Sequence, residues 1–175
     1  MATKRICLAL IIAAIVASPM TINAEQRSES ENAVTVKAAK VKIMEGSWIA
    51  TISAPGLPPF KALLTFTQDG CLLVSQATIV PFPPPIGVVV GSAGHGEWEL
   101  VSNGVFSFTF VALMHDQNAA FLGTSQVSGT IRVDGAMGDF SGTATAADLD
   151  ANGNVMFSFD ATIEAKRIRA RSSAQ

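Results

Sequence analysis

The pattern that most constrains the fold is a series of short runs in which apolar and polar residues alternate, from Gly46 to Lys166. No apolar period of 3.6 residues, which an amphipathic helix needs, occurs in this stretch. Turn signals with Asp-Gly or Asn-Gly separate several of the runs and supply the positive φ angles of tight hairpins. They are Gln68-Asp69-Gly70, Ser102-Asn103-Gly104, Asp134-Gly135 and Asn152-Gly153. Strands and turns that alternate in this way predict an all-β antiparallel barrel or sandwich.

The spacing of the turns predicts eight strands. We expect them at Gly46–Ile52, Phe60–Thr67, Cys71–Val80, His95–Val101, Val105–Met114, Phe121–Val133, Phe140–Ala147 and Val155–Ala165. Most of the connections are short hairpins, and closing such a sheet removes the strand edges that invite aggregation. The chain therefore predicts one eight-stranded antiparallel up-and-down barrel over residues 43–168.

The N-terminal segment, residues 1–24, has the layout of a secretory signal peptide. Lys4 and Arg5 precede the apolar run Ile6–Ala17, and a cleavage site follows at Ala24. The run is too short to span a membrane, so we expect cleavage and a secreted or periplasmic protein. An uncleaved membrane anchor is the alternative.

The segments on either side of the expected barrel, and the charge of the chain, restrict its organisation and its partners. Residues 25–42 are polar without an apolar period and predict a flexible lead-in, and 169–175 form a basic tail. Of 12 Lys and Arg, removal of Lys4 and Arg5 leaves 10, against 14 Asp and Glu. This mild acidity argues against a nucleic-acid partner, which requires a basic face.

A single cysteine, Cys71, is left once Cys7 is removed with the leader. A lone thiol forms no intramolecular disulfide, so export does not imply a disulfide scaffold here. Because Cys71 follows Asp69-Gly70 at the start of an apolar run, we interpret it as a small core residue. A reactive thiol is the alternative.

The inward positions of the expected barrel combine bulky and small side chains. The bulky ones are Trp98, Phe108, Phe157 and Phe159, and the small ones are Gly123, Ser125, Gly129, Gly142, Ala144 and Ala146. An eight-stranded barrel is either filled by side chains or just wide enough for one small ligand. The small residues favour a cavity, and the alternative is that they mark tight bends of the strands.

The segment from Pro81 to Val90 is rich in proline and apolar residues. Pro81-Phe82-Pro83-Pro84-Pro85 cannot lie in a central strand, since proline donates no hydrogen bond to the ladder. A long apolar connection of this kind is often functional. Its composition suits a cap over the barrel mouth, or a contact with a membrane or a protein, and equally a loop folded back on the barrel wall.

Several motifs together resemble those of a known group of proteins. They are Gly46-x-Trp48, Leu64-Thr65-Phe66-x-x-Asp69-Gly70, Gly94-His95-Gly96-x-Trp98, Phe106-x-Phe108, Gly129-Thr130-Ile131 and Gly142-Thr143. The chain resembles, over residues 44–168, small secreted bacterial lipocalin-like proteins, whose barrel is similar to that of the calycins and of allene oxide cyclase. The resemblance implies a binder of hydrophobic ligands, or a cyclase that folds an apolar substrate inside the barrel. It transfers no catalytic residue.

Asp148-Leu149-Asp150-Ala151-Asn152-Gly153 matches the start of a calcium-binding EF-hand loop. The twelfth position, which needs a bidentate carboxylate, is Phe159, and no flanking helices are predicted. We therefore interpret the segment as a hairpin turn and expect no metal site.

His95 and Glu97 are the weak catalytic candidates, because with Glu99 they share one face of a strand and could form an acid–base pair. The alternative, which we favour, is a polar face exposed to solvent opposite Trp98. The sequence contains no nucleophile elbow, phosphate-binding loop or dinucleotide fingerprint, so no cofactor is expected.

Three hypotheses for function follow. The leading one is a secreted, non-enzymatic barrel that binds a small apolar molecule, with a contact set of Phe66, Trp98, Phe108, Phe157, Phe159 and Phe82. The second is a cofactor-free cyclase or isomerase, which would work mainly by holding a polyene or enone in a reactive conformation. The third is a structural or interaction module with a filled core. A polar group that faces the cavity, His95 or Glu97 above all, would favour the enzyme.

Overall fold

The structure is a computed structural model that describes residues 42–81, 87–134 and 138–170. All of them belong to one compact unit, residues 35–175, and a second unit, residues 1–34, lies outside the described residues. The predicted signal peptide, most of the lead-in, Phe82 and the end of the basic tail also lie outside them. No helix in the described part is both long and apolar enough to cross a membrane.

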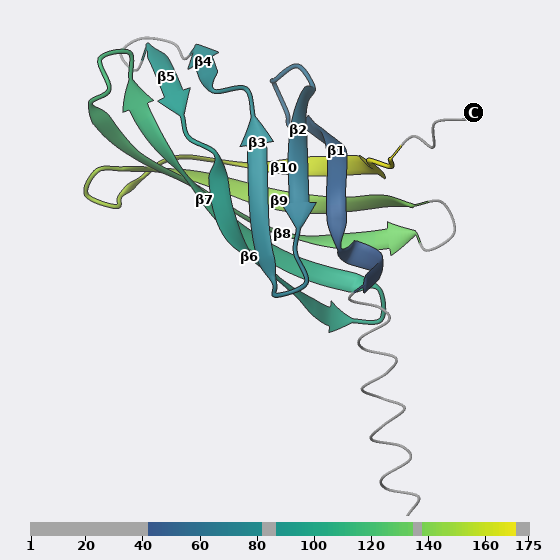
Figure 1. The fold of residues 1–175 in the computed structure, drawn as a ribbon. Helices are drawn as coiled ribbons and strands as arrows, with labels where there is room; N and C mark the ends of the chain where they lie inside the picture. The colour runs from purple at the N-terminus through teal and green to yellow at the C-terminus, as the bar shows by residue number, and fades with distance from the viewer. Residues whose placement is uncertain (1–41, 82–86, 135–137, 171–175) are drawn as a thin grey trace, which may run out of the picture. The chain divides into compact units, whose positions relative to one another are not determined.

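The described residues form ten strands in one antiparallel sheet (Figure 1). They are β1 (Gly46–Ser53), β2 (Phe60–Phe66), β3 (Cys71–Gln76), β4 (Ile79–Pro81), β5 (Val88–Gly91), β6 (Gly94–Ser102), β7 (Val105–Asp116), β8 (Phe121–Asp134), β9 (Asp139–Asp150) and β10 (Val155–Arg167). Along most strands, buried and exposed residues alternate with the period of two that the sequence predicts, so one side of each strand faces the core.

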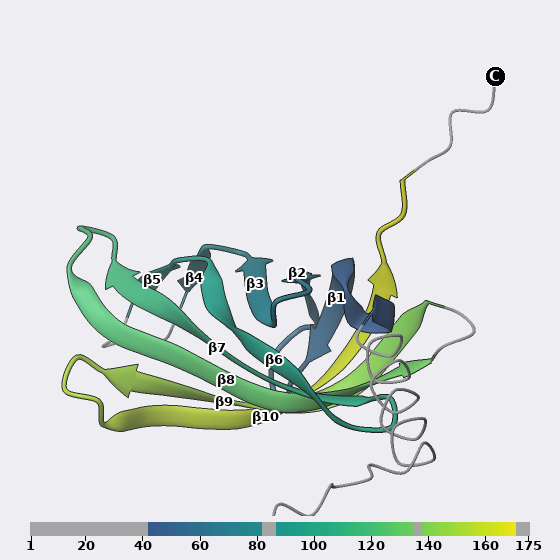
Figure 2. The ribbon, with the colours of Figure 1, turned by 60° about the horizontal axis from the view of Figure 1, so that its bottom comes forward.

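Pairing of β7 with β8 closes the sheet into a barrel. Around the barrel the order is β1, β2, β3, β6, β7, β8, β9 and β10, which returns to β1. Figure 2 shows β8, β9 and β10 side by side as the long strands of the wall. Each strand pairs with its neighbours in the chain once β4 and β5 are set aside. The predicted eight-stranded antiparallel up-and-down barrel is confirmed.

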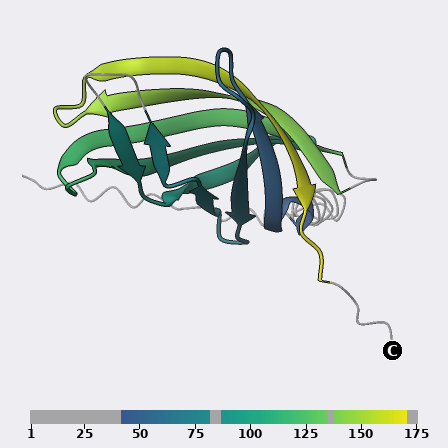
Figure 3. The same cartoon turned by 90° about the horizontal axis from the view of Figure 1, so that it is seen from above.

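The chain between β3 and β6 differs from the prediction. The expected third strand, Cys71–Val80, ends at Gln76, and β4 and β5 then pair with each other. β5 in turn pairs with the end of β7, Val89 with Asp116 and Val90 with His115. The expectation that the connection from Pro81 to Val90 contains no strand was therefore wrong for Val88–Val90. These β-branched residues pair with the part of β7 that extends past the start of β6. In Figure 3, β4 and β5 are the two short teal arrows at the edge of the barrel.

Aromatic rings fill one end of the barrel. Trp48 has no exposed surface and its ring centroid lies 4.9 Å from that of Phe140. Trp98 packs edge-on against Phe66 at 5.8 Å and contacts Phe106 at 5.6 Å. Such tilted and edge-to-face pairs stabilise a core beyond the area that they bury. This end of the interior is therefore occupied by the protein's own side chains.

The helical residues 42–44 close the same end. Met44 is fully buried, and its backbone carbonyl accepts a hydrogen bond of 3.1 Å from Nε1 of Trp48. The guanidinium of Arg167, at the end of β10, lies 4.2 Å from the Trp48 ring centroid and donates to the carbonyl of Glu45. One tryptophan thus joins the helical turn, β1 and the last strand.

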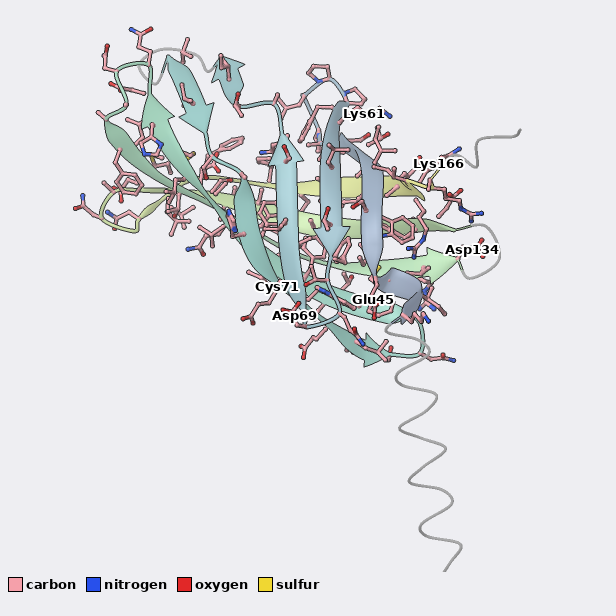
Figure 4. All side chains as sticks on the ribbon, in the orientation of Figure 1. Glu45, Lys61, Asp69, Cys71, Asp134 and Lys166 are labelled. Carbon is pink, nitrogen blue, oxygen red and sulfur yellow. The ribbon has the colours of Figure 1, made fainter. Side chains whose placement is uncertain are left out.

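The prediction that Cys71 is a core residue was wrong, since its side chain is exposed. Leu72 lies directly opposite Phe66 across the β2–β3 hairpin, and residues paired in this way share a face. Leu72 and Val74 therefore face inward, which places Cys71 outside. Figure 4 shows Cys71 next to Asp69 at the start of β3.

Candidate functional site

The interior away from the aromatic end contains a cavity of about 90 Å³. Its wall comes from β1, β2, β3, β7, β8, β9 and β10, and all of its lining residues are apolar apart from Gln76 and Ser125. The cavity is smaller than an engineered cavity of about 150 Å³ that holds benzene. It therefore suits a short apolar chain or one part of a larger molecule.

Three alanines explain why this part of the barrel is not filled. Ala144 and Ala146 on β9 and Ala161 on β10 are buried and line the cavity, and none of them has a side chain that could cross it. The glycines have another role. At Gly129 a Cβ atom would lie 2.3 Å from the carbonyl oxygen of Thr143, so this residue permits the close approach of β8 to β9. The alanines therefore fit the predicted cavity, whereas Gly129 serves close strand packing and not the tight bend that was the alternative.

The predicted ligand contacts divide into several groups. Phe66, Phe108 and Phe159 line the cavity. Trp98 does not, because it belongs to the filled end, where its Nε1 donates to the carbonyl of Thr67 at 3.0 Å. Phe157 lies on the same side of β10 as Phe159 but beyond the cavity, and 51 % of it is exposed. Phe82 lies outside the described residues.

The two weak catalytic candidates face away from the cavity. On β6 the inward residues are Gly94 and Trp98, whereas His95 and Glu97 are exposed on the outer face. Glu99 follows them on this face and accepts a hydrogen bond of 3.3 Å from the Ser107 hydroxyl. Neither His95 nor Glu97 can therefore act on a molecule held inside the barrel.

One ionisable residue on the inner face, Asp148, is not among the site residues predicted from the sequence. It is only 9 % exposed and lies opposite Ser125 on β8 and Phe157 on β10. The signal was present in the alternation, since Ala144, Ala146 and Asp148 follow one another at intervals of two. Its segment, Asp148–Gly153, also matches the start of a calcium loop, a pattern that predicts a turn at these residues instead of a strand.

The turn that follows β9 is held by its own side chains, as predicted. The carboxylate of Asp150 accepts hydrogen bonds from the backbone amides of Asn152 and Asn154, both at 2.8 Å, and from Nδ2 of Asn154 at 2.9 Å. The side-chain bond from Asn154, followed by the backbone bond, lowers the pKa of Asp150 from its ordinary value. Among the described residues, no group of three or more His, Cys, Asp and Glu is placed to hold a metal ion.

We expect calcium to leave the stability unchanged. Phe159, at the twelfth loop position, lies in β10 and lines the cavity, so it offers no ligand to a cation at the turn. Thermal melts with and without millimolar calcium should superimpose. A rise of more than about 4 °C, on the order of 1 kcal/mol for a domain of this size, would contradict this expectation.

A second hollow, an open groove of about 670 Å³, lies on the outer face of the barrel. Its lining includes Lys61, Lys166 and Asp134, which Figure 4 shows on one side of the molecule. Lys61 is exposed and donates to the Thr51 hydroxyl at 2.5 Å. Charges of both signs in open contact with water select no ligand class, so we place the candidate site in the apolar interior of the barrel.

Comparison with known proteins finds no family model and no curated protein that matches this chain. Among solved structures, the chain is similar to a redesigned beta barrel, with 13 % identity and a TM-score of 0.41. The match covers 74 % of this chain and 96 % of that chain. The strand pairing itself defines the class, a closed eight-stranded antiparallel β-barrel. The resemblance to lipocalin-like proteins and allene oxide cyclase stays a prediction.

Proposed function

We propose that this barrel binds a small apolar molecule in its interior and catalyses no reaction on it. The observation that carries the proposal is the apolar cavity in the interior, where the short side chains of Ala144, Ala146 and Ala161 leave space unfilled. Burial of apolar surface favours an apolar ligand by roughly 25 cal/mol per Å². The N-terminal sequence supports export, so the proposed place of binding is outside the cytoplasm.

The path into the cavity supports the same proposal. Phe159 lines the cavity and is half-buried, and Phe157 lies two residues nearer the end of the barrel with half of its surface exposed. Their ring centroids are 5.5 Å apart. A ligand longer than the cavity would therefore continue along an apolar path toward the mouth instead of meeting a polar wall.

A cyclase or isomerase gains no support from the residues that suggested it. His95 and Glu97 lie on the outer face, so neither meets a substrate inside the barrel. A module with a filled core is supported at the aromatic end alone, since the other end contains the cavity. Binding is therefore the function that the interior supports best.

Replacement of Ala144 by phenylalanine tests the proposal. The Ala144 side chain lines the cavity, and a phenyl ring there would occupy the space that a ligand needs. We expect the parent protein to raise the fluorescence of the dye ANS, and we expect the purified variant to fold and to lose this increase. Its melting temperature should fall by no more than a few degrees, because the ring enters empty space. In a core that is already full, overpacking would instead cost about 1–3 kcal/mol.

Thr143→Phe is the matched control, because Thr143 is the neighbouring residue on β9 and its side chain is exposed on the outer face. This variant adds the same ring to the same strand and should bind the dye like the parent. A parent protein that never binds ANS, together with a strongly destabilised Ala144→Phe variant, would show that the core is already full and would refute the proposal.

A further inference from the structure

Asp148 is an ionisable residue in an interior that is apolar apart from Gln76 and Ser125. It follows Ala144 and Ala146 at intervals of two on β9, and both alanines line the cavity. Ser125, its register partner on β8, lines the cavity as well. Asp148 therefore lies on the inner face, one step from the cavity toward the mouth.

The carboxylate of Asp148 has no partner among the residues that the structure describes. It takes part in no hydrogen bond or ion pair with a described residue, although only 9 % of the residue is exposed. No fully buried side-chain oxygen in this part of the chain lacks a partner, so the carboxylate oxygens reach the solvent at the mouth. The carboxylate therefore lies among apolar side chains and still faces the space through which a ligand would enter, where it can accept a charge-assisted hydrogen bond.

Aromatic rings stand beside this carboxylate. Phe157 is its register partner on β10, half exposed, and Phe159 follows with a ring centroid 5.5 Å away at an interplanar angle of 40°. The face of a phenyl ring attracts a cation within about 6 Å of its centroid. An ammonium group at this position would gain from both the carboxylate and the rings, whereas a hydroxyl group would gain a single neutral-to-charged hydrogen bond.

We propose that the ligand of this barrel is a small apolar molecule that ends in a protonated amine. The ammonium group binds the Asp148 carboxylate beside Phe157, and the apolar body extends past Ala146 into the cavity. This inference rests on the proposed function, because it names the chemical class of the molecule that occupies the same interior.

The test compares two probes of equal chain length, hexylamine and 1-hexanol, as competitors of ANS bound to the full purified protein. We expect the parent to bind hexylamine about 10- to 100-fold more tightly than 1-hexanol, the range that corresponds to one charge-assisted bond. Asp148→Asn keeps the shape of the side chain and removes its charge, so it should bind both probes with similar affinity. Ala144→Phe should weaken both.

Asp160→Asn is the matched control, since Asp160 is an exposed carboxylate on the outer face of β10 that accepts a hydrogen bond of 2.6 Å from Thr145. It removes one negative charge from the same wall and should keep the preference for the amine. Equal affinity of the parent for the two probes would overturn this inference and leave the proposed function standing, whether or not Asp148→Asn folds. Failure of the parent to bind either probe or the dye would overturn both.

Discussion

Replacement of Trp48 by alanine is expected to destabilise the barrel by about 3–5 kcal/mol, the range for a buried tryptophan. The side chain has no exposed surface, packs on Phe140 at 4.9 Å and donates to the Met44 carbonyl. It also supports the guanidinium of Arg167, which would then cover a void. The variant thus loses apolar burial, a ring pair and the contact that closes the end of the barrel.

The free energy of unfolding in urea measures this loss, and an unchanged slope of that free energy against urea concentration would mean that the substitution changed the stability alone. Ile49→Ala is the control, because Ile49 is the next residue on β1, faces outward and is 44 % exposed. It should cost about 1 kcal/mol or less, in the range of substitutions away from the core. A loss of equal size in the two variants would mean that the burial assigned to Trp48 is wrong.

Gly96→Ala is expected to cost about 3 kcal/mol or more, at the upper end of the range for overpacking. A Cβ atom at Gly96 would lie 1.9 Å from the carbonyl oxygen of Thr109 and 2.5 Å from Cα of Phe110. Both are backbone atoms of β7, the strand paired with β6, so the clash can be relieved only if the two strands separate. We expect the melting temperature to fall by 10 °C or more, at about 4 °C per kcal/mol.

The matched control is Gly153→Ala, in the turn between β9 and β10. Gly153 has a φ angle of +86° and no atom within 4 Å of a built Cβ. Alanine there should cost about 1–2 kcal/mol through backbone strain alone. If Gly96→Ala were no more destabilising than Gly153→Ala, the close approach of β6 and β7 would be refuted.

The candidate site was predictable in part. The inward positions of Phe66, Phe108 and Phe159 follow from alternation, since each lies an even number of residues from another inward residue of its strand. Trp98 has the same periodicity, yet it fills the core, because its place along the barrel axis depends on the stagger of the strands. Asp148 was accessible to the same argument and was missed because its segment also matches a turn motif.

The sequence alone determined the periodicity, the turns and hence the eight strands of the barrel, because these features depend on residues close together in the chain. Only the tertiary structure decided three others. The register of β2 against β3 placed Cys71 outside, the pairing with β7 turned Val88–Val90 into a strand, and the registers of β9 against β8 and β10 placed Asp148 opposite Ser125 and Phe157. Each of these depends on which strands become neighbours and in which register they pair, because a shift of one residue moves every side chain of a strand to the other face.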